Sequence, residues 1–490
     1  MEYISPKRKI RFSRTQKRII IALNVLILAI AIPLLVITFW QGEYLPTGGF
    51  PPSDQRPYER LRDARMSLNP AIDWEINIGG TGSDIPSAVV NQGSHFHIFG
   101  MTTSTDFDFQ TDIAGQKLSM ATLTTLGRTQ NFVILDNGPS INVVKALNFG
   151  QNRTLLLYSR SDTAVIARVA CDGTITHSFE RPHSHAVDFI IDGSRIILVV
   201  SHERGAFDSG LTVFVLNENL ALDTTAPWHT RTTNISNHSL AYNSIFPWQG
   251  NYLVFAMDTF NRIPVAVEFG EYFNPQNNVH NLSLSSVPDF VLHDVVPFVD
   301  GATRFMMTGI ANGAPHLIAV KSENNRYMAG SHTPLATALG ISGAIRTEFL
   351  MVDNNIVGNP PELFVFAASN TRSAVRRMAK GSTPLAPPST AFDGLNTSAF
   401  VSDSIMSRRA VQPQETLLFG SDFDNNLFLT RLSISSATPL LTFGGQRTDT
   451  AVAMTLTDRG VIIVAATNSD TGDVSANFGG IDTWVALIPL

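Results

Sequence analysis

The chain has 490 residues, of which 44% are hydrophobic and 16% are charged, and its formal net charge is −6. This composition excludes an intrinsically disordered chain, and the length exceeds one ordinary hydrophobic core unless the fold is built from repeated modules. The single cysteine, Cys171, excludes an intrachain disulfide and a cysteine-based metal site.

The first 40 residues predict a membrane anchor. Residues 1–18 carry seven basic side chains and one acidic side chain, and residues 19–40 contain no charged side chain. A helix of 22 residues spans a hydrocarbon core of about 30 Å. Because basic residues stay on the cytoplasmic side, we expect residues 1–18 to form a cytoplasmic tail, 19–40 a single transmembrane helix, and the rest to lie outside. A cleaved signal peptide is the alternative, but its apolar region is usually about 7–15 residues long and ends in small residues, whereas this run ends in Ile-Thr-Phe-Trp.

Residues 41–72, rich in proline and glycine at their start, are interpreted as a stalk. The 28 basic and 40 acidic residues that follow the tail give the outer part a net charge of −12. Because nucleic-acid phosphates require a basic surface, this charge excludes a nucleic-acid partner. The expected partners are the lipid bilayer, through residues 19–40, and an unknown protein or glycan.

Residues 73–490 predict an all-β fold. Short runs of β-forming residues alternate with turn residues, and no long stretch has the apolar period of a helix. Eight such runs recur at the spacing of a propeller blade, at residues 95–101, 154–160, 195–201, 251–257, 304–310, 363–369, 416–422 and 461–467. Most have a second apolar run on either side. The 418 residues allow about 52 residues for each of eight blades or about 60 for each of seven. We therefore expect an eight-bladed β-propeller, with seven blades as the alternative.

One phrase, Gly-Gly-x-x-x-Asp-x-x-x-Ala, occurs near both ends of this region. Residues 76–123 and 441–488 align without a gap at an offset of 365, with ten identities in 48 positions, among them Gly79, Gly80, Asp84, Thr102 and Ser104. We interpret residues 73–127 and 439–490 as the first and last blades, which would lie side by side in a closed ring. The glycines would allow a positive φ or a close backbone approach, and the aspartates would accept hydrogen bonds from backbone N–H groups.

The phrase resembles the Gly-Gly-rich β-propeller repeat found in many bacterial surface and secreted proteins. The resemblance implies a propeller outside the cytoplasm. It implies no particular activity, because that family is defined by its architecture.

Two clusters are candidate metal ligands. His183, His185 and Asp188 lie within one short segment, and two histidines at positions i and i+2 of a strand face the same way. Surface histidines are the alternative interpretation. Asp422, Asp424 and Asn426 have the first spacings of a calcium loop, but the glycine and glutamate that an EF-hand requires are absent, so a solvated turn is the alternative to a calcium ion.

No nucleophile elbow, zinc-protease helix or phosphate loop is present in the sequence, and the catalytic residues stay unknown. We expect no cofactor, with calcium as the one alternative. The function expected from the sequence is a protein- or glycan-binding or scaffold module held outside the cell membrane. The alternative is an envelope polysaccharide hydrolase or lyase with its site at the propeller channel.

Overall fold

The computed structural model describes residues 69–490 apart from 151, 204–208, 234–239, 275–277, 283–284, 301–302, 325, 340, 342, 353–361, 370–372, 378–399, 408–414, 422–425, 434–436 and 475–476. The expected tail, anchor and most of the stalk lie outside these residues. The chain divides into two units, Met1–Tyr58 and Glu59–Leu490, and all that follows concerns the second. Within the residues described, no helix has the length and apolar character needed to cross a membrane.

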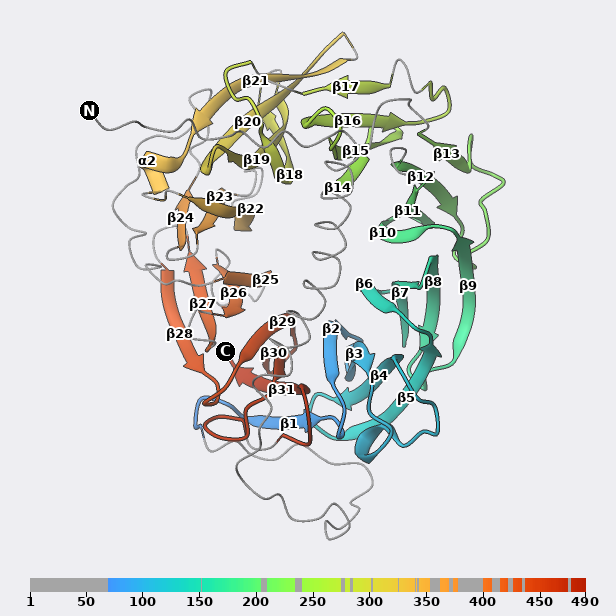
Figure 1. Ribbon diagram of the computed structural model, residues 1–490, viewed down its shortest axis with the longest axis vertical. Helices are drawn as coiled ribbons and strands as arrows, with labels where there is room; N and C mark the ends of the chain where they lie inside the picture. Colours follow the sequence, from blue (N-terminus) through green and yellow to red (C-terminus); the bar gives the residue numbers. More distant parts are fainter. Residues whose placement is uncertain are drawn as a thin grey trace, which may run out of the picture. The chain divides into compact units, whose positions relative to one another are not determined.

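The described residues form eight antiparallel sheets, numbered here first to eighth by their position in the chain (Figure 1). The first four sheets contain β2 (Asp84–Asn91), β3 (His95–Thr102), β4 (Lys117–Thr124) and β5 (Thr129–Asn137); β6 (Ile141–Asn148), β7 (Arg153–Arg160), β8 (Thr163–Ala170) and β9 (Ile175–Pro182); β10 (His185–Asp192), β11 (Arg195–Glu203), β12 (Ser209–Leu216) and β13 (Thr230–Thr232); and β14 (Leu240–Trp248), β15 (Asn251–Asp258), β16 (Ile263–Phe269) and β17 (Val279–Asn281).

The last four sheets contain β18 (Val291–Asp300), β19 (Thr303–Ala311), β20 (Ala314–Glu323) and β21 (Arg326–Pro334); β22 (Ala344–Val352), β23 (Glu362–Ser369) and β24 (Ser373–Arg377); β25 (Phe400–Ser407), β26 (Glu415–Ser421), β27 (Leu427–Ser433) and β28 (Ala437–Phe443); and β29 (Asp449–Leu456), β30 (Gly460–Thr467) and β31 (Asp482–Pro489), joined by β1 (Trp74–Ile78). The short helices among the described residues are η2 (Phe107–Phe109) and α2 (Ala336–Leu339).

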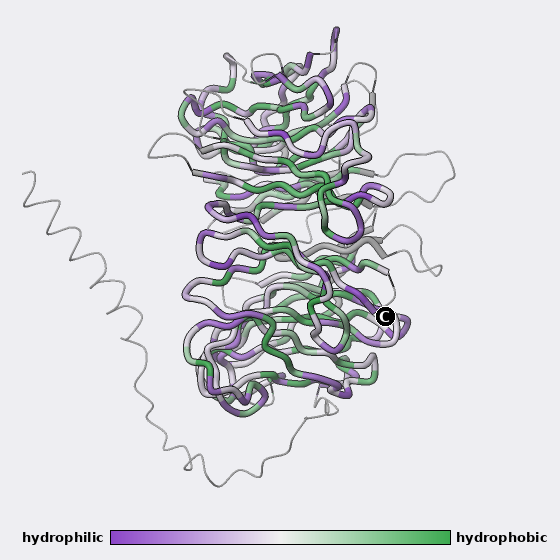
Figure 2. Tube along the Cα trace, turned by 90° about the vertical axis from the view of Figure 1, so that its right-hand side faces the viewer, coloured by the Kyte–Doolittle hydropathy of each residue, from purple (hydrophilic) through white to green (hydrophobic). Residues whose placement is uncertain are grey.

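The sheets stand around a common axis, which makes the fold a β-propeller (Figure 1). In each sheet the first strand is innermost, and it packs against the first strand of the next sheet. The eight runs that set the predicted spacing are the second strands, β3, β7, β11, β15, β19, β23, β26 and β30. These strands read as continuous apolar runs because their side chains are buried on both faces between neighbouring sheets. The hydrophobic residues accordingly concentrate in the middle of each sheet (Figure 2).

The ring closes through its first strand. β1 pairs antiparallel with β31, from Trp74 opposite Leu487 to Ile78 opposite Thr483, and so forms the outer strand of the eighth sheet. The expected first blade, 73–127, is therefore wrong at its start, because residues 74–78 belong to the last sheet and the first sheet begins at Asp84. The expected last blade, 439–490, is also wrong at its start, because β28 extends to Phe443 in the seventh sheet. The expectation that the two ends pack side by side is confirmed, since β2 packs against β29 and β30, and one apolar cluster joins both sheets.

The repeated phrase forms the same loop twice, between the outer strand of one sheet and the inner strand of the next. Asp84 accepts hydrogen bonds from the Gly80 N–H (2.7 Å), the Ser104 hydroxyl (2.7 Å) and the Thr102 hydroxyl. Asp449 accepts the equivalent bonds from Gly445 N–H (2.6 Å), Ser469 and Thr467. We call each set an Asp clasp. In each, the threonine hydroxyl also accepts the N–H of the serine, at 3.0 Å.

The glycines of the phrase are required mainly by close approach. Only Gly444 has a positive φ, +145°. A Cβ atom at Gly445 would lie 2.1 Å from the Ser469 Cβ, and one at Gly79 would lie 2.2 Å from Asp482 Oδ1. Both approaches are too short for any side chain, so the expectation of a positive φ holds at one position and the alternative of a close approach accounts for the others.

Every inner strand carries a β-bulge at the same place. The pairing with the second strand shifts by one residue in all eight sheets. The residue just past the bulge is charged in five of them, Lys145, Asp188, Asp294, Arg346 and Asp403. Because a bulge changes the direction of the side chains beside it and is frequent next to active sites, the charged residues at this level of the ring are candidate functional residues.

Candidate functional site

The first predicted metal cluster is dispersed in the structure. His183 has a positive φ of 53° and an exposed side chain, and its Nδ1 lies 3.0 Å from Asp162 Oδ2. His185 is exposed at the start of β10. Asp188 instead forms an ion pair with Lys145, 2.8 Å between Oδ1 and Nζ. No group of three metal-ligating side chains is present among the residues that the structure describes.

The second predicted cluster lies largely outside the description. Asp422 and Asp424 are not among the described residues, whereas Asn426 immediately precedes β27 and is partly buried. The Cα atom of Asn426 would lie 3.7 Å from a Cβ placed on Gly444, at the start of the second Asp clasp. Calcium binding at this turn stays a prediction.

Two of the charged residues past the bulges, Lys145 and Asp188, connect neighbouring inner strands. Lys145 on β6 donates to Asp188 Oδ1 and to the Phe189 carbonyl on β10, at 2.8 and 2.9 Å. The Tyr242 hydroxyl on β14 donates to the other oxygen of Asp188. Burial and the Asp188 charge both raise the pKa of Tyr242, which keeps this donor protonated. The group therefore ties three successive sheets together, and its carboxylate is already occupied by protein donors.

A second inner-strand cluster lies between the fifth and sixth sheets. Asp294 accepts the backbone N–H groups of Val295 and Phe349, both at 2.7 Å, and His293 Nδ1 accepts the Thr347 N–H at 3.1 Å. Arg346 is held by Glu348, with 2.7 Å between Nη2 and Oε2. Burial raises the pKa of Asp294 to about 6, although the two N–H groups and Arg346 oppose that change. Burial and the Arg346 charge lower the pKa of His293.

This raised pKa predicts a pH-dependent stability. A carboxyl whose pKa is higher in the folded state contributes stability that is present below its unfolded pKa and is lost as the pH rises through about 6. We expect Asp294→Asn, which keeps an acceptor oxygen for one of the two backbone N–H groups, to lack that loss. As the pH rises from 4 to 7.5, the free energy of unfolding of the variant should increase relative to that of the native chain by about 2–3 kcal/mol. Urea unfolding at the two pH values measures it, and a difference that does not change with pH would contradict the assignment.

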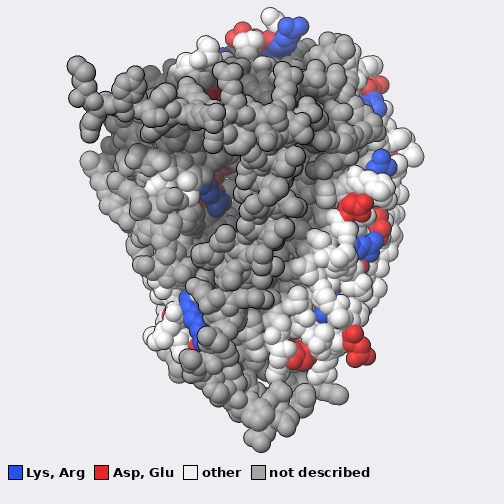
Figure 3. Space-filling view, viewed as in Figure 1, with Lys and Arg blue, Asp and Glu red and all other residues white. Residues whose placement is uncertain are grey.

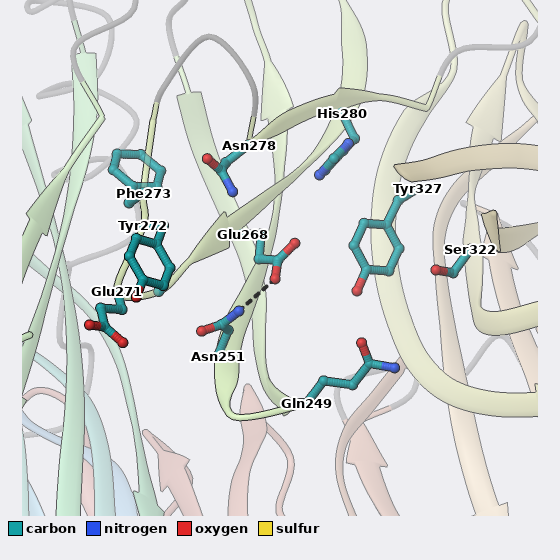
Figure 4. A pocket seen from close by; sticks show the side chains of 11 residues that line it. Gln249, Asn251, Glu268, Glu271, Tyr272, Phe273, Asn278, His280, Ser322 and Tyr327 are labelled. Carbon is teal, nitrogen blue, oxygen red and sulfur yellow. Dashed lines mark hydrogen bonds between the residues drawn. The ribbon is translucent and has the colours of Figure 1, made fainter. Parts of the chain in front are cut away.

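An open pocket lies at the rim of the ring, between the fourth and fifth sheets (Figure 4). Its volume is about 350 Å³, and it is lined by Gln249, Asn251, Glu268, Gly270, Glu271, Tyr272, Phe273, Asn278, His280, Ser322 and Tyr327. We call it the rim pocket. Its wall begins at the hairpin turn between β14 and β15, where Gln249 and Gly250 have φ values of 50° and 81°. Two successive positive φ angles are typical of the tightest hairpin turns, and they bring Gln249 to the edge of the pocket.

The polar side chains of the rim pocket are ordered by their neighbours. Asn251 donates to Glu268 Oε1 at 2.7 Å, and a Cβ on Gly270 would lie 2.2 Å from the Asn251 side-chain oxygen. The rings of His280 and Tyr327 meet edge to face, with 5.1 Å between centroids. Burial lowers the pKa of His280, against the opposing charge of Glu268, and burial and the same charge raise the pKa of Tyr327. Both groups are therefore neutral hydrogen-bonding groups at pH 7.

Charge is not concentrated on the face seen down the ring axis. Acidic and basic side chains of the described residues alternate along its right-hand border (Figure 3). The described residues of this face therefore form no patch of a single charge sign. The candidate sites are the inner-strand clusters and the rim pocket.

The rim pocket was not predicted from the sequence. Its residues come from five separate segments, 249–251, 268–273, 278–280, 322 and 327, and neither the blade period nor the repeated phrase marks them. One local signal was present, namely the adjacent aromatic residues Tyr272 and Phe273 in an otherwise polar loop between two strands.

No family model and no curated protein matches the chain. Among solved structures, the chain is similar to the Dos1 propeller, with a TM-score of 0.46 and 8% identity over 87% of this chain and 96% of that one. It is also similar to the β-propeller domain of Cps50 (Swd1) from Myceliophteria thermophila, with a TM-score of 0.41 and 11% identity over 71% and 99%. A protein from Lactobacillus plantarum matches with a TM-score of 0.43 and 11% identity over 74% and 96%.

Proposed function

We propose that this chain is a membrane-anchored module that holds an eight-bladed β-propeller outside the cytoplasm and uses it to bind a protein or a glycan, or to act as a scaffold. The proposal includes the resemblance to the Gly-Gly-rich repeat family. The eight sheets support the blade count, and the two Asp clasps support the shared repeat. The absence of charge from residues 19–40 supports the anchor.

The rim pocket is the observation that carries a binding function. It presents polar and aromatic side chains to solvent in a concave site of the size that small ligands occupy. The carboxylates of the inner strands behave differently. Asp188 is occupied by Lys145 and Tyr242, and Asp294 by two backbone N–H groups. Because these carboxylates hold neighbouring strands together, we assign them a structural role.

The topology gives a direct test of the anchored module. Because seven basic residues precede the apolar run, residues 1–18 should be cytoplasmic and residues 41–490 outside. Protease added to intact cells or spheroplasts is expected to remove a tag at the C-terminus and to spare a tag at the N-terminus. The control is the same digestion after the cells are lysed, when both tags should be cut. A C-terminal tag that survives on intact cells contradicts the proposed orientation.

A second function, an envelope polysaccharide hydrolase or lyase, is favoured by one observation. The pKa of Asp294 is raised to about 6 beside Arg346, which suits a general acid or base near neutral pH. If the full-length protein depolymerises an envelope polysaccharide, Asp294→Asn is expected to abolish that turnover without unfolding the ring. Turnover that the variant retains, or no turnover by the native chain, removes this alternative.

A further inference from the structure

The aromatic side chains of the rim pocket give it an apolar face. Tyr272 is 87% exposed at the edge of the pocket. Its neighbour Phe273 stacks on Phe269 of β16, with 4.9 Å between ring centroids, and so fixes the loop that carries the tyrosine. An aromatic ring beside a polar pocket suits a ligand that has both C–H faces and hydroxyl groups.

The polar side chains supply donors and acceptors in alternation. Glu268 offers carboxylate oxygens, three amide side chains offer both kinds of group, and Ser322 and Tyr327 offer hydroxyl groups. His280 is 7% exposed, and within the part of the chain that the structure describes its Nε2 has no hydrogen-bond partner. Its ring extends into the space between Glu268 and Tyr327 (Figure 4). A buried polar atom without a partner is costly, and a ligand hydroxyl in that space would supply one.

The charge of the pocket excludes other ligand classes. Among the described residues, no lysine or arginine lines the pocket, and Glu268 lies in its wall, so phosphate, sulfate and uronate groups are disfavoured. Glu271 points away from Glu268, on the far side of Tyr272 (Figure 4). Because the two carboxylates do not converge on one point, they do not form the oxygen shell that a divalent cation needs.

The structure points to a neutral saccharide as the ligand of the rim pocket. We propose that one or two sugar rings bind there, with a C–H face packed on Tyr272 and with hydroxyl groups bound by Glu268, Asn251, His280 and Tyr327. This proposal rests on the function of the chain as a binding module and names its ligand class. The volume of about 350 Å³ lies within the range of small-molecule sites, and the exposed position of Tyr272 leaves a longer glycan free to continue outside.

Calorimetric titration of the full-length protein in lipid nanodiscs tests the proposal. The probes are short neutral oligosaccharides of glucose, mannose and N-acetylglucosamine, an oligogalacturonate, and tetramethylammonium as a simple cation. We expect at least one neutral oligosaccharide to bind and the other two classes not to bind. Tyr272→Ala should weaken the affinity about tenfold or more, and Tyr327→Phe, which removes one hydroxyl, about fivefold. Binding of the uronate or the cation in place of the neutral sugars overturns the proposal.

A matched aromatic residue at the opposite end of the same hairpin provides the control. Phe260 is 61% exposed in the turn between β15 and β16, so Phe260→Ala changes exposed aromatic surface without touching the pocket and should leave the affinity within twofold. Sugar binding that persists unchanged in Tyr272→Ala and Tyr327→Phe also overturns the proposal. Sedimentation with insoluble envelope glycan separates the two sources of sugar, because retention supports a wall polymer and binding of soluble oligosaccharides alone supports free sugars.

The test separates this proposal from the broader function. Photo-crosslinking of the full-length chain in its native membrane reports whether the propeller contacts an envelope protein or glycan at all. If crosslinked partners appear and do not change in Tyr272→Ala, the binding module stands and the saccharide pocket is wrong. If sugar binds as expected, both proposals are supported together.

Discussion

Removal of residues 444–490 is expected to leave no soluble folded propeller. The deletion takes away β29, β30 and β31, the three strands that β1 completes into the eighth sheet. Ten buried side chains on the flanking sheets then lose the surface they pack on, five on the seventh sheet and five on the first with its loop: Leu417, Phe419, Leu427, Leu429, Phe443, Phe96, Ile98, Phe109, Ala121 and Leu123. If each side chain loses only about 1 kcal/mol of burial energy, the total loss is comparable to the stability of a whole domain, which is roughly 5–15 kcal/mol.

The exposed flanks also explain why aggregation should follow, since the missing sheet leaves two open apolar surfaces and an unpaired β1. Size-exclusion chromatography and circular dichroism of the truncated chain measure the outcome. The control is a permuted chain in which residues 69–78 follow residue 490 through a short turn. It keeps every strand, because β1 and β31 are already antiparallel neighbours, and it should fold. A soluble, monomeric truncated chain would show that the ring does not depend on its last sheet.

Replacement of either clasp aspartate by alanine is expected to cost about 3–5 kcal/mol of unfolding free energy. Asp84 and Asp449 are buried, at 2% and 0% exposure, and each accepts one backbone N–H and two hydroxyl groups. Alanine leaves those donors buried without a partner. Burial is the largest influence on both carboxyl groups and raises their pKa above the ordinary value, so the charge itself is not the stabilising element.

Asparagine distinguishes the two effects. Asp84→Asn and Asp449→Asn keep one acceptor oxygen and remove the buried charge, so each should cost markedly less than the alanine variant. Asp162→Ala is the surface control, because that carboxylate is 63% exposed and contacts only an exposed histidine in the interactions described, and it should change stability by less than about 0.5 kcal/mol. Chemical unfolding of the six chains settles the order. Equal stability of Asp84→Ala and Asp162→Ala would mean that the clasp contributes nothing.

The sequence predicted the strands that are buried on both faces. The apolar runs at 195–201 and 251–257 could be recognised as β11 and β15 because apolar side chains occupy every position from 196 to 200 and from 252 to 257. The outer strands were missed, and β9, whose side chains are mostly exposed, shows why, since it contains few apolar residues. Residues 74–78, which form β1, were included in the first blade and so were assigned to the wrong sheet, because a hydrophobic pattern indicates burial and does not identify the partner strand.

The candidate sites depend on contacts between segments far apart in the chain. Tyr242 reaches Asp188 across 54 residues, and His280 meets Tyr327 across the junction of two sheets. Histidines at 183 and 185 looked adjacent in sequence, yet one lies in a turn and the other begins a strand. The positions of the bulges could not be found from the sequence, because the residue that follows the bulge differs from one inner strand to the next, as Lys145, Asp188 and Ser244 show.

The pairing of β1 with β31 has a consequence for the order in which the chain folds. Trp74 is made before the other strands of the propeller, and its partner Leu487 is made 487 − 74 = 413 residues later. At roughly 5–20 residues per second, synthesis separates the two strands by about 20–80 s. Throughout that time five residues destined for full burial, Trp-Glu-Ile-Asn-Ile, have no partner strand. The ring is therefore closed only after β31 has been made, and until then β1 is open to pairing with another chain unless it is protected.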